Sequence, residues 1–162
     1  MNKKKPLIRG VEIFQNVTPQ CTVSIVEALV PVIMLPREYV MVQGQPGDEM
    51  FFINRGFVQV TQFINFQEAP IRQLTDGGHF GEIALLNANG RRTANVVTIS
   101  FCDLQMLDRK SFSRIQKEHD EFREQVKAYS DARAKTMAAS RSKQMVNTQK
   151  SKSRLALEAV KQ

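Results

Sequence analysis

The sequence predicts an α+β fold: an antiparallel eight-stranded, jelly-roll-like β-roll with N-terminal helices and two C-terminal helices, B and C. Three observations lead to this fold class. Roughly eight short segments rich in β-branched and aromatic residues recur at regular intervals between residues 32 and 108. Seven of the eight glycines lie between Gly44 and Gly90, so turns are concentrated in the same region. On either side of it, apolar residues recur every three or four positions, which is the spacing of helices.

Residues 1–31 are expected to form a helical lead-in. Val11 and Phe14 are spaced by three, and a second apolar cluster follows between residues 23 and 30. The dipeptide Thr18-Pro19 is a typical helix start, because a threonine side chain caps the first turn and proline fits its first position.

Residues 32–108 are expected to form the roll. Arg55-Gly56 lies between two β-rich segments and predicts a hairpin, and a polar loop is expected before the strand that starts at Ile71. Short strands at such regular spacing favour an antiparallel roll or barrel. The expected strands are residues 32–35, 39–42, 50–54, 57–61, 71–75, 95–100 and 102–107.

Residues 109–137 are expected to form helices B and C, with a break near His119-Asp120. One narrow face of helix C carries an arginine within an otherwise apolar stripe, at spacings of four, three, four and four residues. The stripe consists of Phe122, Val126, Tyr129, Arg133 and Met137. From the pattern alone, Arg133 either lays its methylene stem on the roll or contacts a ligand.

The net charge of +7 is unevenly distributed. Residues 1–108 hold nine Lys and Arg against ten Asp and Glu, a net charge of −1, whereas residues 109–162 hold fourteen against six, a net charge of +8. The roll itself is therefore not basic, and no nucleic-acid partner is predicted. Residues 138–162 are rich in Ser, Lys, Arg and Gln, so a frayed helix or disorder is expected there.

Several function classes lack their motifs. No apolar run approaches the length of a membrane span and no signal-peptide pattern follows Met1, so a cytoplasmic chain is expected. Cys21 and Cys102 are isolated, which favours two reduced, buried thiols over a disulfide or a metal site. The chain has only two histidines, and His79 has no predicted partner base or nucleophile, so no enzymatic activity is expected and His79 is an unassigned turn residue.

The stretch from Phe80 to Ala94 has the features of an anion cradle. Gly81 allows a ligand to approach the backbone, and residues 82–86 fit one helical turn whose first N–H groups would face an anion. An arginine and Thr93 then add a bidentate fork and a hydroxyl donor. Glu82 would repel a phosphate, so a ribose hydroxyl is its natural partner. Phosphate plus sugar indicates a nucleotide; the alternative is an amphipathic strand-turn-strand with two solvated arginines.

The order Phe-Gly-Glu-Ile-Ala-Leu-Leu at residues 80–86, a short loop and Arg-Arg-Thr-Ala at residues 91–94 closely resembles the phosphate-binding cassette of the cyclic-nucleotide-binding domain family. The pattern Gly-x-x-Gly-Asp at residues 44–48 is also similar to that family. The resemblance implies a site for cAMP or cGMP, with no further cofactor and no metal.

The resemblance also implies residue roles. Arg92 would bind the equatorial phosphate oxygen, and Gly81 and Glu82 would take the ribose 2′-hydroxyl. Because neighbouring strand residues point to opposite faces, the chain must bend if Arg92 and Thr93 are to serve one phosphate, while Arg91 is expected to be exposed. The phosphate shell would be completed by Thr93 and by the N–H groups of Ile83, Ala84 and Ala94.

Two further pairs of residues are candidates for contact with the nucleotide, although no sequence motif identifies them. In this family the last helix closes over the base like a lid, so Arg133 and Met137 would face the purine. Val60 and Leu74 are candidate apolar walls, although ordinary core packing accounts for them equally well. An apolar Met137 favours cAMP, since cGMP-selective channels often place an acid there.

The cassette sequence is most similar to those of the cytosolic domains of cyclic-nucleotide-gated, hyperpolarization-activated and related potassium channels. The predicted function is cyclic nucleotide-dependent gating, with the pore domain of a channel as partner and a homotetramer formed through it. A stand-alone or kinase-regulatory-type sensor is the alternative, although kinase cassettes tend to carry Ala where Thr93 stands. A roll that binds no nucleotide and serves protein-protein assembly is the second alternative.

Overall fold

The structure is a computed structural model that describes residues 4–87 and 90–159, without the side chains of residues 137, 140–144 and 155–159. It divides into two units, Met1–Val126 and Lys127–Gln162. The first unit contains the β-roll and the helices that pack on it. The second is the remainder of the last helix and the chain end.

Three short helices precede the roll: α1 at Lys5–Arg9, a 3₁₀ helix (η1) at Glu12–Phe14 and α2 at Pro19–Ala28. Helix α2 starts where the sequence predicts. The Thr18 hydroxyl oxygen accepts a hydrogen bond from the Cys21 N–H at 3.2 Å, and proline occupies the first turn.

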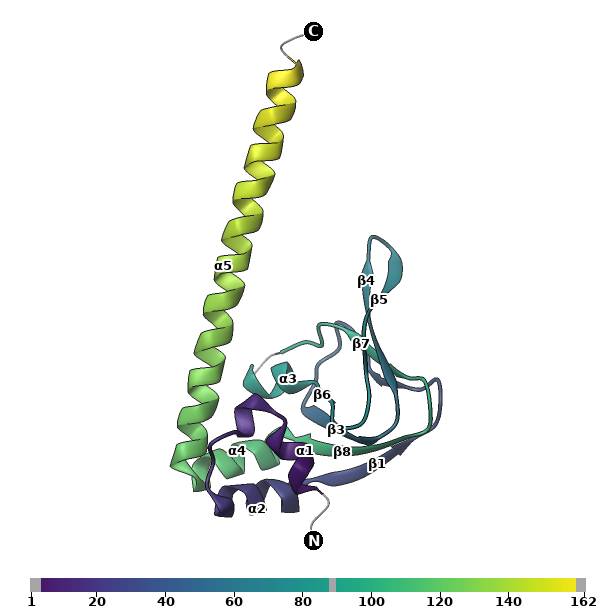
Figure 1. Ribbon diagram of the computed structural model, residues 1–162, viewed down its shortest axis with the longest axis vertical. Coiled ribbons are helices and arrows are strands. Elements are labelled where there is room, and N and C mark those ends of the chain that lie inside the picture. Colours follow the sequence, from purple (N-terminus) through teal and green to yellow (C-terminus); the bar gives the residue numbers. More distant parts are fainter. Residues whose placement is uncertain (1–3, 88–89, 160–162) are drawn as a thin grey trace. The chain divides into compact units, whose positions relative to one another are not determined.

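Eight antiparallel strands form two four-stranded sheets, which confirms the predicted β-roll (Figure 1). One sheet has the order β1-β8-β3-β6 and the other the order β2-β7-β4-β5. The strands are β1 (Val30–Met34), β2 (Tyr39–Met41), β3 (Glu49–Arg55), β4 (Val58–Ile64), β5 (Gln67–Leu74), β6 (His79–Phe80), β7 (Asn95–Thr98) and β8 (Cys102–Asp108).

Strand β3 is buried on both faces. Phe51 and Ile53 belong to the core between the two sheets. Phe52, which points to the opposite face, packs on Phe14 with ring centroids 5.8 Å apart, and Phe14 in turn lies 5.6 Å from Phe122. The uninterrupted apolar run in this strand therefore packs in the core of the roll with one face and against the N-terminal helices with the other.

Arg55-Gly56 does not form the predicted hairpin. Strand β3 pairs with β6 and β8, whereas β4 pairs with β5 and β7, so the chain crosses between sheets at this turn. Gly56 has a φ of 125°, and a Cβ there would lie 2.6 Å from the Cys102 sulfur. Glycine is needed at residue 56 because the chain passes close to Cys102 there. A glycine between two β-rich segments is also typical of a hairpin turn, so the local sequence does not separate the two structures.

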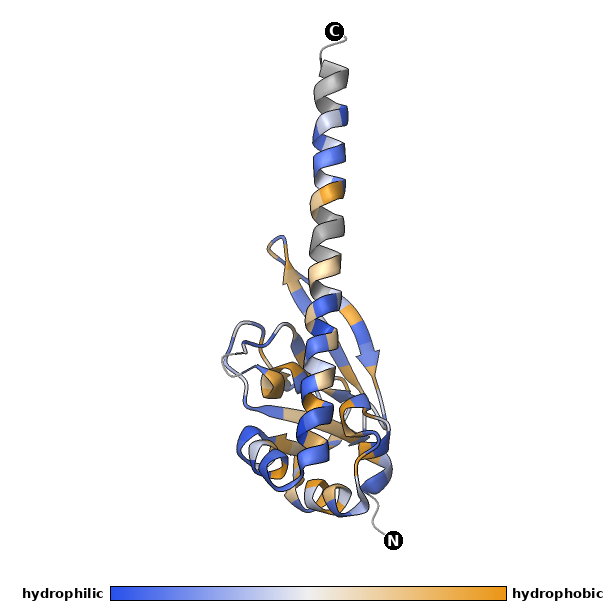
Figure 2. Cartoon of the chain, turned by 90° about the vertical axis from the view of Figure 1, so that its left-hand side faces the viewer, coloured by the Kyte–Doolittle hydropathy of each residue, from blue (hydrophilic) through white to orange (hydrophobic). Residues whose placement is uncertain are grey.

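The hairpin lies instead between β4 and β5, where the sequence predicts a polar loop. The two strands pair up to Ile64 and Gln67, and Asn65 and Phe66 form a two-residue turn with φ values of 51° and 64°. Positive φ at both positions is the type I′ geometry that usually takes Asn-Gly. Because phenylalanine stands where that glycine is usual, the sequence does not indicate a hairpin turn at these two residues. Phe66 is 92% exposed, and Figure 2 shows hydrophobic residues in this hairpin.

Helices α4 (Arg109–Glu118) and α5 (Asp120–Ala159) follow the roll, and the predicted break falls at His119. The Asp108 carboxylate caps α4 by accepting a hydrogen bond from the Ser111 N–H at 2.6 Å. Helix α5 runs to Ala159 through residues for which the sequence predicts a frayed helix or disorder. The chain has no glycine or proline beyond residue 90 to interrupt it.

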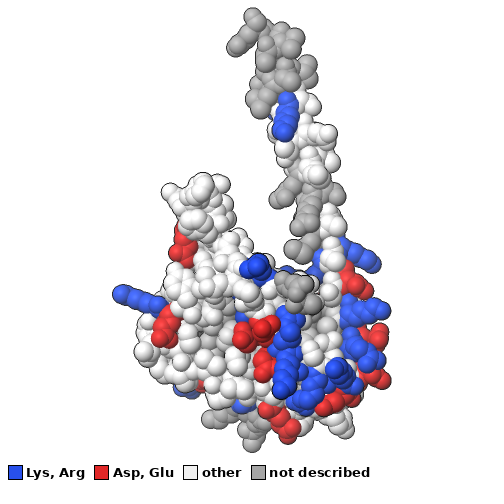
Figure 3. Space-filling model, turned by 180° about the vertical axis from the view of Figure 1, so that it is seen from behind, with Lys and Arg blue, Asp and Glu red and all other residues white. Residues whose placement is uncertain are grey.

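The described helices are too short or too polar to cross a membrane, and the surface carries charges of both signs (Figure 3). Among the described residues, no helix has both the length and the apolar character that crossing a bilayer requires. Figure 3 shows Lys and Arg intermixed with Asp and Glu on the face it presents. Ion pairs also form along one helix, as in Arg114–Glu118 and Arg123–Asp120.

Candidate functional site: the cassette between β6 and β7

The predicted cassette connects the two sheets. Phe80 ends β6, Gly81 precedes α3 (Glu82–Leu86), and the chain returns through Arg92 to β7. Gly81 has a φ of 87°, and a Cβ there would lie 2.9 Å from both Arg92 Nη1 and the Glu49 backbone oxygen. A glycine is therefore required where the two halves of the cassette meet.

The Arg92 side chain holds these halves together. Its Nη2 forms an ion pair with Glu49 Oε2 at 3.0 Å, and its Nη1 donates to the backbone carbonyls of Glu49 at 2.7 Å and Gly81 at 3.4 Å. The Arg92 backbone is also fixed, because its N–H donates to the Gln45 carbonyl and its carbonyl accepts from the Gly44 N–H, both at 2.8 Å. The guanidinium is thus preorganised in one orientation.

Arg92 is buried, with 7% of the residue exposed. Burial lowers the pKa of Arg92 below its ordinary value, and the nearby charges of Glu49 and Asp48 oppose that shift. An arginine nevertheless stays protonated in proteins. Its side-chain hydrogen bonds to the described residues use three of five N–H donors, which leaves donors for a bound anion.

Arg92 and Thr93 differ in exposure as neighbouring residues of an extended chain do: Arg92 is buried and Thr93 is exposed. The chain bends at Thr93 and Ala94 before β7 begins. A shared phosphate contact of Arg92 and Thr93 stays a prediction. Arg91 is exposed, as the sequence predicts, and its Nη1 donates to the Gly44 carbonyl at 2.8 Å.

Helix α3 supplies the backbone donors of the cassette. Glu82 and Ile83 are half-buried and Ala84 is buried. The Ala84 N–H donates to the Gly81 carbonyl at 3.2 Å, so a phosphate contact from this N–H would have to share or replace that bond. The N–H group of Ile83 belongs to the first turn of α3, where the helix has no carbonyl four residues earlier to accept it.

The three apolar candidates pack in the roll. Phe80 stacks on Phe51 with ring centroids 5.3 Å apart. Val60 is a buried member of the same core, and the partly buried Leu74 packs against it. Core packing accounts for the burial of all three side chains, and a contact of Val60 or Leu74 with a nucleotide stays a prediction.

Arg109, the first residue of α4, was not identified from the sequence. Its Nη2 donates to the backbone carbonyls of Ala84 and, at 3.0 Å, Asn87, and its Nε pairs with Asp48 Oδ1 at 2.9 Å. The Arg109 N–H also donates to the Asp48 carbonyl at 2.7 Å. A cation at this end of α3 satisfies carbonyls that the helix leaves open. Asp48 belongs to the Gly-x-x-Gly-Asp pattern, but its ion-pair partner Arg109 lies 61 residues away in the sequence, so no local pattern joins the two.

Arg133 lies in the second unit. Its Nη1 donates to the Tyr129 hydroxyl at 3.3 Å, and its guanidinium carbon lies 5.9 Å from the Tyr129 ring centroid. These neighbours in the predicted stripe therefore contact each other along α5. The Met137 side chain lies outside the described residues. Within the first unit, Phe122 and Val126 of the stripe are buried.

Sequence comparison finds a channel and a protein kinase among the relatives of this chain. The human cyclic nucleotide-gated channel alpha-3 is 34% identical over 125 residues, which cover 70% of this chain and 17% of the channel. The cGMP-dependent protein kinase, isozyme 1, of Drosophila melanogaster is 34% identical over 112 residues, which cover 67% of this chain and 14% of the kinase. The chain thus spans less than a fifth of the length of these curated relatives.

A structural comparison shows which fold the chain shares, and a family model shows which family it belongs to. The solved regulatory domain of Toxoplasma gondii PKA, crystallised with cAMP, has a similar fold: the TM-score is 0.67 at 24% identity, over 70% of this chain and 43% of that chain. The family model for the cyclic nucleotide-binding domain matches residues 31–119, more than half of the sequence. The chain therefore belongs to the cyclic nucleotide-binding domain family.

Proposed function

We propose that this domain binds a cyclic purine nucleotide at the cassette and reports the occupancy of that site to an attached effector through α4 and α5. The observation that carries the proposal is the buried Arg92 guanidinium, held against Glu49 and Gly81 inside the cassette. Burying a charge is unfavourable unless it is paired. A paired, preorganised guanidinium with N–H donors to spare suits the bidentate recognition of a phosphate.

The proposed contacts divide between phosphate and sugar. Arg92 neutralises the single negative charge of the cyclic phosphodiester, and Thr93 adds a hydroxyl donor. Glu82 accepts a hydrogen bond from the ribose 2′-hydroxyl, close to Gly81. The backbone N–H groups proposed to complete the phosphate shell are those of Ile83, Ala84 and Ala94.

The proposed signal passes from α3 to α4. Because the Arg109 guanidinium is hydrogen-bonded to the carbonyls of Ala84 and Asn87, a nucleotide that shifts α3 also changes the position of the first residue of α4. Ligand then favours one arrangement of the C-terminal helices over another, which is a population shift. Arg133 and Met137 of α5 are proposed to cover the base in the ligand-bound arrangement. The domain is a regulatory binding module, and no catalytic role is proposed for its residues.

The effector that we propose is the pore of a cyclic nucleotide-modulated cation or potassium channel, located in a longer chain. The domain would then lie on the cytoplasmic side of the membrane and form a homotetramer through the pore. Thr93 in the cassette supports this choice over a kinase-type sensor, whereas overall identity is 34% to both the human channel and the Drosophila kinase. A reading frame with six apolar spans upstream is the expected finding. A kinase domain or a second nucleotide domain in that frame contradicts the channel assignment.

Calorimetry tests nucleotide binding directly. The purified domain is titrated with cAMP, with cGMP and with 5′-AMP, which has the same base and sugar as cAMP but an open phosphate. We expect saturable binding of cAMP at a single site and weaker binding of cGMP, because Met137 offers the guanine no acid. Binding of 5′-AMP should be the weakest. If neither cyclic nucleotide binds, the domain is a roll that serves assembly alone.

A further inference from the structure

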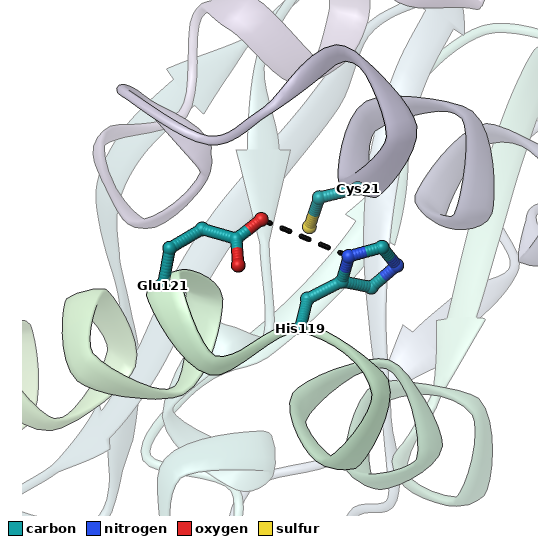
Figure 4. A group of neighbouring side chains, drawn as sticks. All are labelled: Cys21, His119 and Glu121. Atoms are coloured by element: carbon teal, nitrogen blue, oxygen red, sulfur yellow. Dashed lines mark ion pairs between the residues drawn. The ribbon is translucent and has the colours of Figure 1, made fainter.

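A second group of chemically reactive side chains is built from elements other than those of the cassette. Cys21 of α2, His119 between α4 and α5, and Glu121 in the first turn of α5 bring a sulfur, a ring nitrogen and a carboxylate oxygen within 4.8 Å of one another. Figure 4 shows the Cys21 sulfur directed toward the space between the imidazole and the carboxylate. The sequence predicts no metal site here, because residues so far apart in the chain share no ligand-spacing pattern.

We propose that Cys21, His119 and Glu121 form a binding site for a divalent transition metal ion of the zinc class. Thiolate, imidazole and carboxylate are the three ligand types that zinc takes in proteins, whereas Mg²⁺ and Ca²⁺ select oxygen ligands only. Ligands at about 2.0–2.3 Å from a tetrahedral ion lie roughly 3.5 Å from one another. The side chains therefore need to close by about an ångström, which small rotations about their own bonds allow.

Ser24 supplies an independent observation. His119 Nε2 lies 3.0 Å from Ser24 Oγ, while His119 Nδ1 faces Glu121 Oε1 at 3.7 Å. In the tautomer that donates from Nε2 to the serine, the Nδ1 lone pair points into the cluster. Metal-binding histidines are commonly oriented in this way by a hydrogen bond at their other ring nitrogen.

Thr18 positions the other two ligands. Its hydroxyl donates to Glu121 Oε1 at 2.7 Å and accepts from the Cys21 N–H at 3.2 Å. One residue therefore fixes both the carboxylate and the start of the helix that carries the thiol. Supporting hydrogen bonds to the ligands are characteristic of preorganised metal sites.

Exposure indicates how an ion would enter. Cys21 is fully buried, whereas 16% of the His119 side chain and 37% of the Glu121 side chain are exposed. An ion approaching from the carboxylate side would keep a water molecule as its fourth ligand. Burial, and then the charge of Glu121, raise the pKa of the Cys21 thiol to about 11, so the bound metal replaces a thiol proton, which passes to solvent.

The site would restrain the junction of the two C-terminal helices. His119 is the residue at which the chain leaves α4, and Glu121 belongs to the first turn of α5. A metal ion held by these residues and Cys21 ties that junction to α2. Metal binding and nucleotide binding use different residues, so the two proposals are tested separately.

Cobalt titration tests the site. Protein treated with a chelator and then freed of it is titrated with Co²⁺, and Zn²⁺ is added afterwards as a competitor. We expect tetrahedral Co²⁺ absorption with a thiolate-to-cobalt charge-transfer band, and its loss on addition of Zn²⁺. Cys21→Ser should abolish the charge-transfer band. Cys102→Ser, the other buried cysteine, is the matched control and should retain it.

Two milder variants guard against effects of Cys21→Ser on folding. Ser24→Ala and Glu121→Gln should each weaken Co²⁺ binding roughly ten- to a hundredfold, while the thermal melt of the metal-free protein shows that each variant is folded. The proposal is overturned if the wild-type protein shows no charge-transfer band, or if the band survives in Cys21→Ser. Unchanged Co²⁺ affinity in both Ser24→Ala and Glu121→Gln also overturns it.

Discussion

The Arg92 guanidinium and the Glu49 carboxylate form an ion pair at 3.0 Å in which 5% of the arginine side chain and 38% of the glutamate side chain are exposed. The carboxylate therefore compensates a buried cation while keeping contact with water itself. Loss of Glu49 would leave an uncompensated charge, whereas loss of Arg92 would leave a carboxylate that water can solvate. A bound phosphate would bring a second anion to the same guanidinium and use its remaining donors.

Replacement of Arg92 by alanine should weaken cAMP binding by about one to two orders of magnitude, because a charge-assisted contact contributes roughly 1.5–3 kcal/mol. Arg91→Ala is the matched control: the neighbouring arginine is exposed and should change the affinity little. Calorimetry on both variants measures the effect. Equal affinities of Arg92→Ala and wild-type protein would remove Arg92 from the phosphate site.

Gly47→Ala should reduce nucleotide affinity by steric displacement of Arg92. A Cβ at Gly47 would overlap the arginine side chain, with its Cδ atom at 2.7 Å. Such overpacking costs about 1–3 kcal/mol, and the guanidinium would leave its orientation. Gly10→Ala provides the comparison, since its Cβ meets only the Leu7 carbonyl oxygen at 4.0 Å. The idea fails if Gly47→Ala binds cAMP as tightly as Gly10→Ala does.

Arg109→Ala should destabilise the domain and loosen the link between cassette and helices. The side chain satisfies the Ala84 and Asn87 carbonyls and pairs with Asp48, so we expect a loss of about 1–3 kcal/mol in the free energy of unfolding. Urea denaturation followed by circular dichroism measures this loss. The adjacent exposed Lys110 gives the control, Lys110→Ala, which should unfold like the wild type. Coincident unfolding curves for the two variants would contradict the role given to Arg109.

Phe66→Gly should stabilise the β4–β5 hairpin. Phe66 has a φ of 64° and is 92% exposed, so glycine relieves left-handed strain with little loss of burial. The relief of about 1–2 kcal/mol exceeds the added chain entropy of glycine, which leaves a net gain of roughly 0.5 kcal/mol. Gly77→Ala, at a φ of 83° in open space, should do the opposite. Thermal melts compare both with the wild type, and a lower melting temperature for Phe66→Gly would refute the argument.

The success of the sequence predictions depends on whether the signal is local. The Thr18 cap and the helix break at His119 both follow from neighbouring residues, and both are present. The hairpin predicted at Arg55-Gly56 is wrong, because glycine permits both a hairpin and a crossing between sheets.

Long-range pairs had no local signal at all. Arg109 meets Asp48 only because β8 places the start of α4 beside the turn before β3. Likewise, Cys21 and His119 come together because α2 packs against α4. Contacts of this kind depend on tertiary packing, which neither spacing nor residue propensity encodes.

A crystal structure of the domain with cAMP tests the central claim most directly. The account predicts that a phosphate oxygen lies within hydrogen-bond distance of the Arg92 guanidinium and that the ribose 2′-hydroxyl lies beside Glu82. A nucleotide bound elsewhere, with Arg92 still hydrogen-bonded to Glu49 and Gly81 alone, would contradict it.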